Sequence, residues 1–340
     1  MIIKHQLRLF KDSETKGSEI AKDITQKEWG TFKDSLKAPI HRWFTYPAGF
    51  SYKAVESNFK THNITKEHTV YDPFMGSGTT NVVAKTLAIN SYGIEAHPFI
   101  FEIAKAKLDW SVTAKDITDA VQNIKEEIVG LIKDTSRSAP DILTKEFPEL
   151  ILKCYEEKTL LELLLIRDAI ARQKLNEKTN RFLFVGLANL LRQVSSAATG
   201  WPYIAPKKKK TSSNGKVPFV EFKKVIYGML NDIQATIAQA NPSYVDSNHV
   251  IINADSNNTV GLIKNTSIDH IFTSPPYLNN FDYADRTRLE LYFFGKAKTW
   301  KDITATIRSK LMTSATTQIS RNDPRYLLSN ELQSCCPEVF

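Results

Sequence analysis

Asp72-Pro73-Phe74-Met75-Gly76-Ser77-Gly78-Thr79-Thr80 forms a glycine-rich turn between a strand-like and a helix-like segment. The strand-like segment runs from His68 to Asp72, and the helix-like segment runs from about Thr79 to Ile89. A second strand-like segment, Ser91 to Glu95, follows at once, and Pro98 opens another helix that continues to about Trp110. This alternation is typical of a parallel sheet with crossover helices, so the sequence predicts an α/β fold.

The glycines of this turn indicate a ligand, because glycine lets the backbone approach a bound molecule and the helix start offers free N–H groups. A triphosphate-binding loop needs a lysine after its last glycine, where Thr79 stands. A dinucleotide-binding turn needs a third glycine, where Asn81 stands. The ligand that remains is S-adenosylmethionine (SAM), whose ammonium group needs an acid close to the turn.

Three acids end predicted strands and can serve such a ligand. Asp72 stands beside the turn and fits the SAM ammonium group. Glu95 ends the second strand, where a carboxylate can accept hydrogen bonds from both ribose hydroxyls. Asp255 ends a third predicted strand, His249 to Asp255, and fits the adenine amine. The alternative for each acid is a structural one, because Asp and Glu at strand ends often cap helices.

A second motif, Thr273-Ser274-Pro275-Pro276-Tyr277, follows another predicted strand, Asp269 to Thr273. Two successive prolines cannot continue a strand ladder and do not easily start a helix. Pro275 and Pro276 therefore fix a rigid, extended bend at the carboxyl end of the strand. Ligands of open parallel sheets bind at that edge, so we expect the two motifs to lie together.

These residue types suit methyl transfer to a base amine, which is a poor nucleophile because its lone pair is delocalised into the ring. Ser274 Oγ and the carbonyl of Pro275 can each accept one amine hydrogen, which makes the nitrogen pyramidal and exposes its lone pair. Tyr277 can stack on an extruded base. Alignment and electrostatics then supply most of the rate. The alternative is a proline loop with a surface tyrosine.

The segment after the second motif, Leu278-Asn279-Asn280-Phe281-Asp282-Tyr283, also has substrate-binding character. Asn279 and Asn280 can pair with base edges or backbone, and Phe281 and Tyr283 can wedge or stack. The alternative is a helix entry capped by Asp282. A helix that contains Leu289 to Phe293 follows.

Together, the two motifs resemble those of the DNA amino-methyltransferases of bacterial restriction–modification systems. The segment Trp43 to Ser51 is similar to the stretch that covers the methionine end of SAM in this family, which implies cofactor contacts for Phe50 and Ser51. The resemblance also implies a Rossmann-like SAM methyltransferase sheet. It places Phe74, Gly76 and Gly78 against SAM, with Glu95 on the ribose. Serine before Pro-Pro-Tyr is the form more typical of cytosine-N4 enzymes, whereas adenine-N6 enzymes more often carry aspartate.

The resemblance implies a split domain organisation. We expect an N-terminal arm over residues 1–40, with a helix around Asp23 to Leu36, and a methyltransferase core made of residues 41–110 and 245–340. A large, mainly helical insertion, residues 111–244, separates the two core parts and is the candidate target-recognition region. It contains a predicted loop, 196–218, and a helix of roughly Phe219 to Ala240.

The predicted loop carries a basic run of four lysines beside Trp201 and Tyr203: Lys207, Lys208, Lys209 and Lys210. These lysines are candidates for phosphate contact. The alternative is a solvated, charged loop. A formal net charge of +8 and a pI near 9.1 also suit a polyanionic partner, here double-stranded DNA.

The composition indicates the cellular compartment and gives no sign of a metal site or a membrane segment. The three cysteines show no zinc-ligand spacing, no metal site is predicted, and a reducing cytoplasm is the simplest compartment. No long apolar run or secretory signal indicates a membrane.

The predicted function is therefore a site-specific DNA methyltransferase that methylates cytosine N4 within a restriction–modification system, with a cognate endonuclease as a partner. Adenine-N6 methylation, RNA guanine-N2 methylation, and a SAM- and DNA-binding module that needs a second polypeptide are the alternatives. The last is an expectation from the family fold, which adds strands after Tyr277 that this sequence does not show. Either a partner supplies the C-terminal strands, or the chain is a truncated fragment.

Overall fold

A parallel sheet forms one side of the molecule in the computed structural model, which describes residues 29–46, 49–135, 138–198, 204–209, 215–276 and 282–312. Its four strands are β1 (Thr69–Asp72), β2 (Asn90–Ile94), β5 (His249–Ile252) and β6 (His270–Ile271). They lie in the order β5-β2-β1-β6, and every pair is parallel. The predicted α/β sheet is confirmed.

The strand order places the two motifs side by side. After β1 the chain moves to β2 and then outward to β5, and it returns on the other side of β1 as β6. The central strand β1 is therefore the point where the strand order reverses, and such a point opens a crevice at the carboxyl ends of the strands. The glycine turn follows β1 and the proline bend follows β6, so both stand at this crevice.

Three helices precede or follow the first two strands along the chain: α2 (Tyr52–Thr61), α3 (Thr79–Thr86) and α4 (Pro98–Leu108). Ser51 caps α2 by accepting a hydrogen bond from the Lys53 N–H, and proline stands in the first turn of α4. A small apolar cluster that includes Phe59, Val70 and Val83 fastens α2 and α3 to β1.

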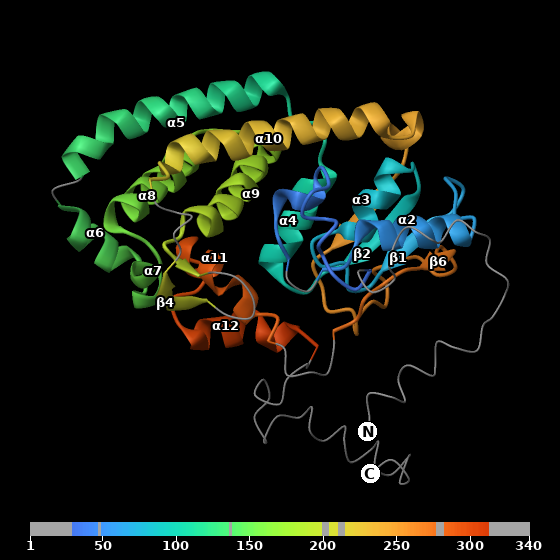
Figure 1. Cartoon of the computed structure of the whole chain (residues 1–340). Coiled ribbons are helices and arrows are strands. Elements are labelled where there is room, and N and C mark those ends of the chain that lie inside the picture. Colours follow the sequence, from blue (N-terminus) through green and yellow to red (C-terminus); the bar gives the residue numbers. More distant parts are fainter. Residues whose placement is uncertain are drawn as a thin grey trace, which may run out of the picture.

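The second part of the molecule is helical, and Figure 1 shows it beside the sheet. Its elements are α5 (Ala114–Thr135), α6 (Ala139–Glu146), α7 (Glu149–Cys154), α8 (Glu157–Arg172), α9 (Glu177–Val194), α10 (Pro218–Gln239), α11 (Arg288–Phe293) and α12 (Trp300–Thr306). Helix α10 spans both parts, because Asn241 at its end donates a backbone hydrogen bond to Thr86 O at the end of α3. One apolar core, from Ile40 to Ile307, joins the helical part to the sheet.

Short 3-10 helices complete the elements: η3 (His41–Trp43), η5 (Pro242–Val245), η6 (Asp285–Thr287) and η7 (Arg308–Lys310). Within the described residues, no helix has both the length and the apolar character needed to cross a membrane.

Two sequence predictions about local structure were wrong. Part of the predicted loop 196–218 is an antiparallel ribbon, in which β3 (Ala197–Ala198) pairs with β4 (Ala205–Lys209). The predicted helix at Asp23 to Leu36 is a series of turns over its described part, residues 29–36. Side chains explain the second difference, because Asp34 and Ser35 bond the Phe50–Ser51 segment instead of supporting a local helix.

Candidate active site

A hydrogen bond joins the two motifs. Thr273 Oγ1 donates to Asp72 Oδ1 over 2.7 Å, and Thr80 Oγ1 donates to the other oxygen of the same carboxylate over 2.7 Å. The backbone N–H of Phe74 is a third donor, at 3.1 Å from Oδ1. Burial raises the pKa of Asp72 to about 6, against the lowering effect of these hydrogen bonds. Asp72 therefore lies beneath both bends and fastens them to each other.

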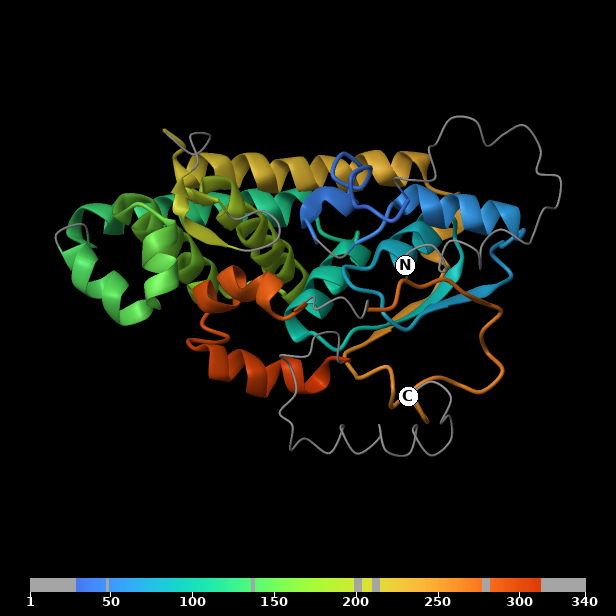
Figure 2. The ribbon, with the colours of Figure 1, turned by 60° about the horizontal axis from the view of Figure 1, so that its bottom comes forward.

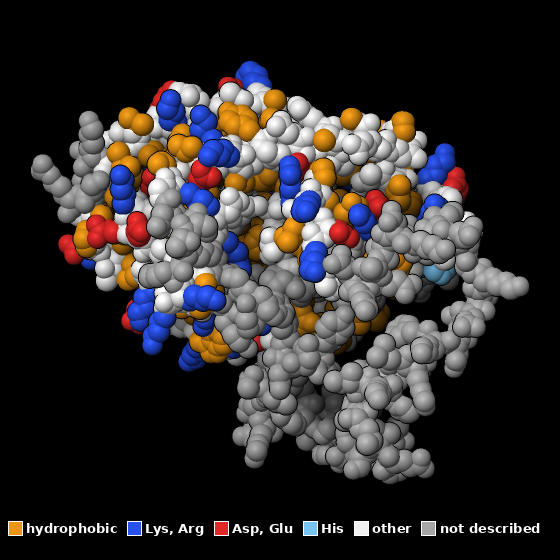
Figure 3. Space-filling view, viewed as in Figure 1, with side chains coloured by type: hydrophobic (Ala, Val, Ile, Leu, Met, Phe, Trp, Pro, Cys, Tyr) orange, Lys and Arg blue, Asp and Glu red, His pale blue; other side chains and the backbone are white. Residues whose placement is uncertain are grey.

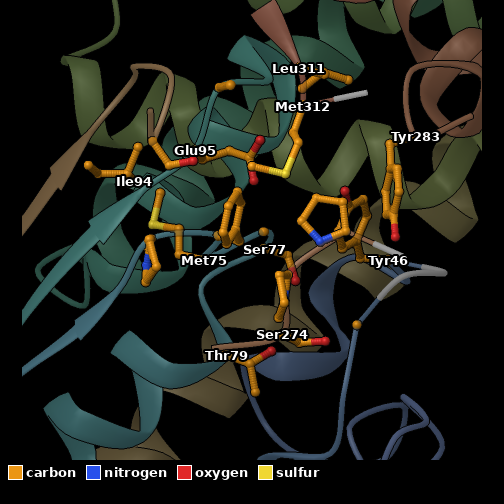
Figure 4. A pocket seen from close by; sticks show the side chains of 18 of the residues that line it. Tyr46, Met75, Ser77, Thr79, Ile94, Glu95, Ser274, Tyr283, Leu311 and Met312 are labelled. Atoms are coloured by element: carbon orange, nitrogen blue, oxygen red, sulfur yellow. The ribbon is translucent and has the colours of Figure 1, made fainter. Parts of the chain in front are cut away.

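Above this carboxylate, the bends enclose a cavity of about 310 Å³. Figure 4 shows its wall, with Ile94 and Met75 on one side in this view and Tyr283 on the other. The wall includes eight residues that the sequence singled out: Phe50, Phe74, Gly76, Glu95, Asp255, Ser274, Pro275 and Pro276. A cavity of this volume lies at the lower end of the range for small-molecule sites.

The glycine turn has its shape because two positions have positive φ. Gly76 has φ of 52°, and a Cβ there would stand 3.0 Å from the Tyr46 ring. Gly78 has φ of 83°, and a Cβ there would stand 3.2 Å from Ala104 Cβ on α4. Glycine suits both positions because it adopts a positive φ freely and has no Cβ to meet these neighbours. Gly76 thus lets Tyr46 close over the turn, whereas Gly78 contributes to helix packing and does not line the cavity.

Glu95 stands where β2 ends, and its side chain enters the cavity wall. Its Oε1 accepts a hydrogen bond of 2.7 Å from the His97 N–H. Burial raises the pKa of Glu95 to about 7, and the nearby charge of Asp72 adds to this effect. A carboxylate beside the apolar side chains of Ile94 and Met75 can hold hydroxyl groups while a flat, apolar ring packs next to it.

Asp255 lies in the cavity wall and also shapes a turn. Its Oδ1 accepts a hydrogen bond of 2.9 Å from the Asn257 N–H, and its carbonyl accepts one of 3.0 Å from the Asn258 N–H. Asp255 therefore shapes a turn and caps no helix, and it lies in the cavity wall, from which it can reach a ligand.

Other predicted site residues lie apart from the cavity. Ser51 is fully buried, donates a hydrogen bond to Asp34 and caps α2. Lys207 and Lys208 are exposed on β4, within the helical part of the molecule. Five predicted residues lie outside the described residues: Tyr277, Asn279, Asn280, Phe281 and Lys210. The backbone of Lys209 ends β4, and its side chain also lies outside the described part.

The structure adds cavity residues that sequence analysis did not assign to the site: Tyr46, Met75, Ser77, Leu311 and Met312. It also places Tyr283, which the sequence singled out for stacking, in the cavity wall. Met75 and Ser77 could have been found, because they belong to the quoted turn. No sequence signal marked Leu311 and Met312, which reach the cavity because α12 and η7 return the chain to the sheet edge.

Asp282 has the structural role that was the alternative prediction for its segment. Its Oδ1 accepts hydrogen bonds from the backbone N–H groups of Ala284, at 3.1 Å, and Asp285, at 3.3 Å. These bonds fix the turn that leads into η6 and leave Tyr283 in the cavity wall. The same short segment therefore contains both the predicted helix entry and a ring that faces the cavity.

The described residues contain no group of three or more His, Cys, Asp or Glu side chains that could hold a metal ion. The cavity therefore has a carboxylate and apolar surface at the end of β2, and a serine and two prolines after the end of β6. The strand β1 lies between these two strands.

Comparisons with known proteins agree with this geometry. Residues 5–106 match a family model described as DNA methylase. The chain is 27% identical over 292 residues to the Type II methyltransferase M.BsoBI of Geobacillus stearothermophilus, an alignment that covers 78% of this chain and 54% of the relative. It is 24% identical over 327 residues to the Type II methyltransferase M.MjaII of Methanocaldococcus jannaschii, with 73% of this chain and 61% of the relative covered.

A third relative, the Type II methyltransferase M.MvaI of Kocuria varians, is 25% identical over 174 residues, which cover 49% of this chain and 37% of the relative. No solved structure matches the chain significantly. The chain spans roughly half the length of the curated relatives that it matches. These similarities confirm the predicted resemblance to the DNA amino-methyltransferases of restriction–modification systems.

Proposed function

We propose that this chain carries the catalytic core of a site-specific DNA methyltransferase, which transfers a methyl group from SAM to cytosine N4. The observation that carries the proposal is the shared cavity. Glu95, at the end of β2, and Ser274, after β6, line the same space of about 310 Å³. The carboxylate that we assign to the nucleoside of SAM and the two acceptors that we assign to the base amine therefore line the same cavity.

The residues of the cavity suit SAM. Glu95 can accept hydrogen bonds from ribose hydroxyls, and the apolar surfaces of Phe74, Met75 and Ile94 can cover the adenine. Gly76 keeps the backbone open at the start of α3, where N–H groups can approach a polar ligand. When bound, SAM supplies an electrophilic methyl group. Asp72, which is buried and already accepts three hydrogen bonds, acts as a positioning residue.

The second bend activates and orients the base. Ser274 Oγ and the Pro275 carbonyl accept the two amine hydrogens, so the nitrogen lone pair faces the donor side of the cavity. Pro275 and Pro276 keep these acceptors in place, because the ring of each proline fixes its φ angle. Tyr46 and Tyr283 offer aromatic surface for the extruded base. The rate then comes from alignment in a preorganised site.

Serine before Pro-Pro-Tyr supports cytosine N4 over adenine N6. The test is mass spectrometry of nucleosides from DNA that has been incubated with the chain and isotope-labelled SAM. We expect N4-methylcytosine. N6-methyladenine alone would exclude cytosine as the target and support the adenine alternative. Labelled guanine in structured RNA, with no labelled DNA, would support RNA guanine-N2 methylation instead.

The length of the relatives keeps the split-enzyme alternative open, because their activity resides in longer chains. The same assay is therefore done with the chain alone and with the product of the adjacent gene. Activity only in the mixture supports a module that binds SAM and DNA but needs a second polypeptide. A cytoplasmic enzyme paired with a cognate endonuclease is the biological setting that we propose.

A further inference from the structure

A basic segment that sequence analysis did not single out lies next to the candidate active site. It covers residues 294–312 and includes α12 and η7. Its exposed lysines are Lys296, Lys298, Lys301 and Lys310. We call these four residues the α12 lysines. Asp302 is the one carboxylate in this segment, so the local charge is strongly positive.

The single carboxylate of the segment has a structural task. Asp302 accepts hydrogen bonds from the backbone N–H groups of Lys298, at 2.9 Å, and Thr299, at 2.8 Å, and Thr299 Oγ1 accepts one from the Asp302 N–H at 3.2 Å. This reciprocal pair is a capping box, which fixes the start of α12. No ion pair found in the described part of the chain includes any of the α12 lysines. Their charges are available to an external partner.

The opposite side of the segment is firmly packed. Ile303 and Ile307 are buried in the main apolar core. The Arg308 guanidinium is also buried, lies 4.1 Å from the centre of the Trp300 ring and pairs with the Asp282 carboxylate. With its inner side anchored in this way, the segment presents its lysines to solvent on a rigid support.

The basic segment continues into the wall of the cavity. Leu311 and Met312, which follow η7, line the cavity, and so does Tyr283, which follows Asp282. The pair of Arg308 with Asp282 therefore connects the basic segment to two parts of the cavity wall. Figure 2 shows α12 beside the carboxyl edge of the sheet, and Figure 3 shows Lys and Arg side chains gathered where Figure 1 places α12 and β4.

We propose that the α12 lysines bind the phosphate backbone of duplex DNA beside the target base. The inference rests on the proposed function and adds the surface that holds the substrate. A base enters such a cavity only after leaving the duplex, so the flanking phosphates must lie at the cavity mouth. Lysines there release counterions from DNA and fix the register of the duplex without reading its sequence.

The test compares two sets of four Lys→Gln substitutions in the full chain. The first set replaces the α12 lysines. The matched control removes the same charge by replacing four exposed lysines that lie outside both α12 and the candidate target-recognition region: Lys37, Lys60, Lys66 and Lys264. Affinity for a labelled duplex is measured by fluorescence anisotropy between about 50 and 200 mM salt, the range over which phosphate binding changes affinity most clearly.

We expect the α12 set to lower duplex affinity by at least about tenfold. It should also make the slope of log affinity against log salt shallower by about 0.9 for each phosphate that the variant no longer neutralises. SAM affinity, measured by calorimetry, stays within about twofold of wild type, and the control set leaves duplex affinity within about threefold. Unchanged affinity in the α12 set, or an equal loss in the control set, overturns the proposal.

Separate readouts distinguish this proposal from the proposed function. If the wild-type chain binds duplex and the α12 set weakens binding, but no DNA is methylated by the chain alone or together with the product of the adjacent gene, the surface is supported and the function is rejected. If the wild type methylates DNA and the α12 set binds and methylates normally, the surface alone is rejected. A wild-type chain that binds structured RNA and no duplex overturns both.

Discussion

Thr273 donates a hydrogen bond of 2.7 Å to the Asp72 carboxylate across 201 positions of sequence, and so it ties the bend after β6 to the turn after β1. Neither residue needs to touch substrate for this bond to matter. It sets the distance between the bend that carries Ser274 and the wall that carries Glu95.

Thr273→Val should remove this bond at nearly constant volume. We expect the free energy of unfolding to fall by about 1.5–3 kcal/mol, because a buried carboxylate loses a donor. Methyl transfer should fall about tenfold or more, while SAM affinity changes less than threefold, since a shift of the bend affects alignment most. Thr273→Ser keeps the hydroxyl and should restore most of both quantities. Equal losses in the serine variant would contradict this role.

Ser274→Ala should impair turnover selectively. Removing one preorganised polar group from an active site typically costs about 10²–10³-fold in kcat, and the acceptor at Ser274 acts on the base amine and not on SAM. Single-turnover methylation and SAM calorimetry measure the two effects separately. Ser256→Ala is the matched control, because this serine lines the same cavity from the β5 side. A comparable loss of SAM affinity and turnover in Ser274→Ala would remove its catalytic assignment.

The ionisation of Glu95 should control SAM affinity. Burial raises the pKa of Glu95 to about 7, and only the ionised form accepts hydrogen bonds with both oxygens. SAM affinity should therefore rise between pH 6 and 8, and Glu95→Gln should bind more weakly with little pH dependence. Calorimetry over this pH range makes the comparison. A steep pH dependence that persists in Glu95→Gln would exclude Glu95 as its source.

The same raised pKa values affect the stability of the ligand-free protein. In the folded state Glu95 binds its proton up to about pH 7 and Asp72 up to about pH 6, above their usual values of 4.5 and 3.8. The folded state thus holds more protons than the unfolded state within these windows, so stability falls as pH rises through them. Denaturant unfolding from pH 4 to 8 should show this fall. It should be smaller in Glu95→Gln.

The sequence predicted the sheet edge well, because each motif is locally determined. Glycines at 76 and 78, after a strand, predict the turn, and prolines at 275 and 276, after another strand, predict the bend. The rule that parallel strands present their carboxyl ends at one edge was then enough to bring the motifs together.

Residues brought in by packing could not be predicted. Tyr46 reaches the turn because Gly76 leaves room for its ring, and Leu311 and Met312 reach the cavity because Arg308 pairs with Asp282. The β3–β4 ribbon was also missed, because a run of lysines shows no alternation of apolar and polar residues. Such packing depends on the arrangement of distant elements and leaves no periodic signal.

Gly76→Ala should test the shape of the cofactor turn. Alanine at a φ of 52° costs about 1–2 kcal/mol, and its Cβ would stand 3.0 Å from the Tyr46 ring, so the turn or the ring must shift. We expect lower stability and SAM affinity reduced at least about fivefold. Gly228→Ala is the control, because a Cβ in the middle of α10 meets nothing within 4 Å. It should raise stability by up to about 1 kcal/mol and leave SAM affinity unchanged.

Arg308 should act as a positioning residue for the DNA side of the site. Its guanidinium donates to the Asp282 carboxylate, with Nε at 2.9 Å from Oδ2, and lies over the Trp300 ring. Arg308→Met removes one partner of this half-buried carboxylate and should lower the free energy of unfolding by about 1–3 kcal/mol. Because Asp282 also fixes the turn before η6, beside Tyr283 of the cavity wall, the KM for DNA should rise more than SAM affinity falls.

Adding Asp282→Asn to Arg308→Met separates charge from position. Asparagine keeps the oxygen that bonds the turn before η6 and removes the half-buried charge, so the double variant should recover part of the lost stability. It lacks the link between the α12 segment and the cavity wall, so the KM for DNA should stay high. Thermal unfolding and steady-state methylation measure the two effects. If the KM for DNA returned to the wild-type value together with stability, Arg308 would have a purely structural role.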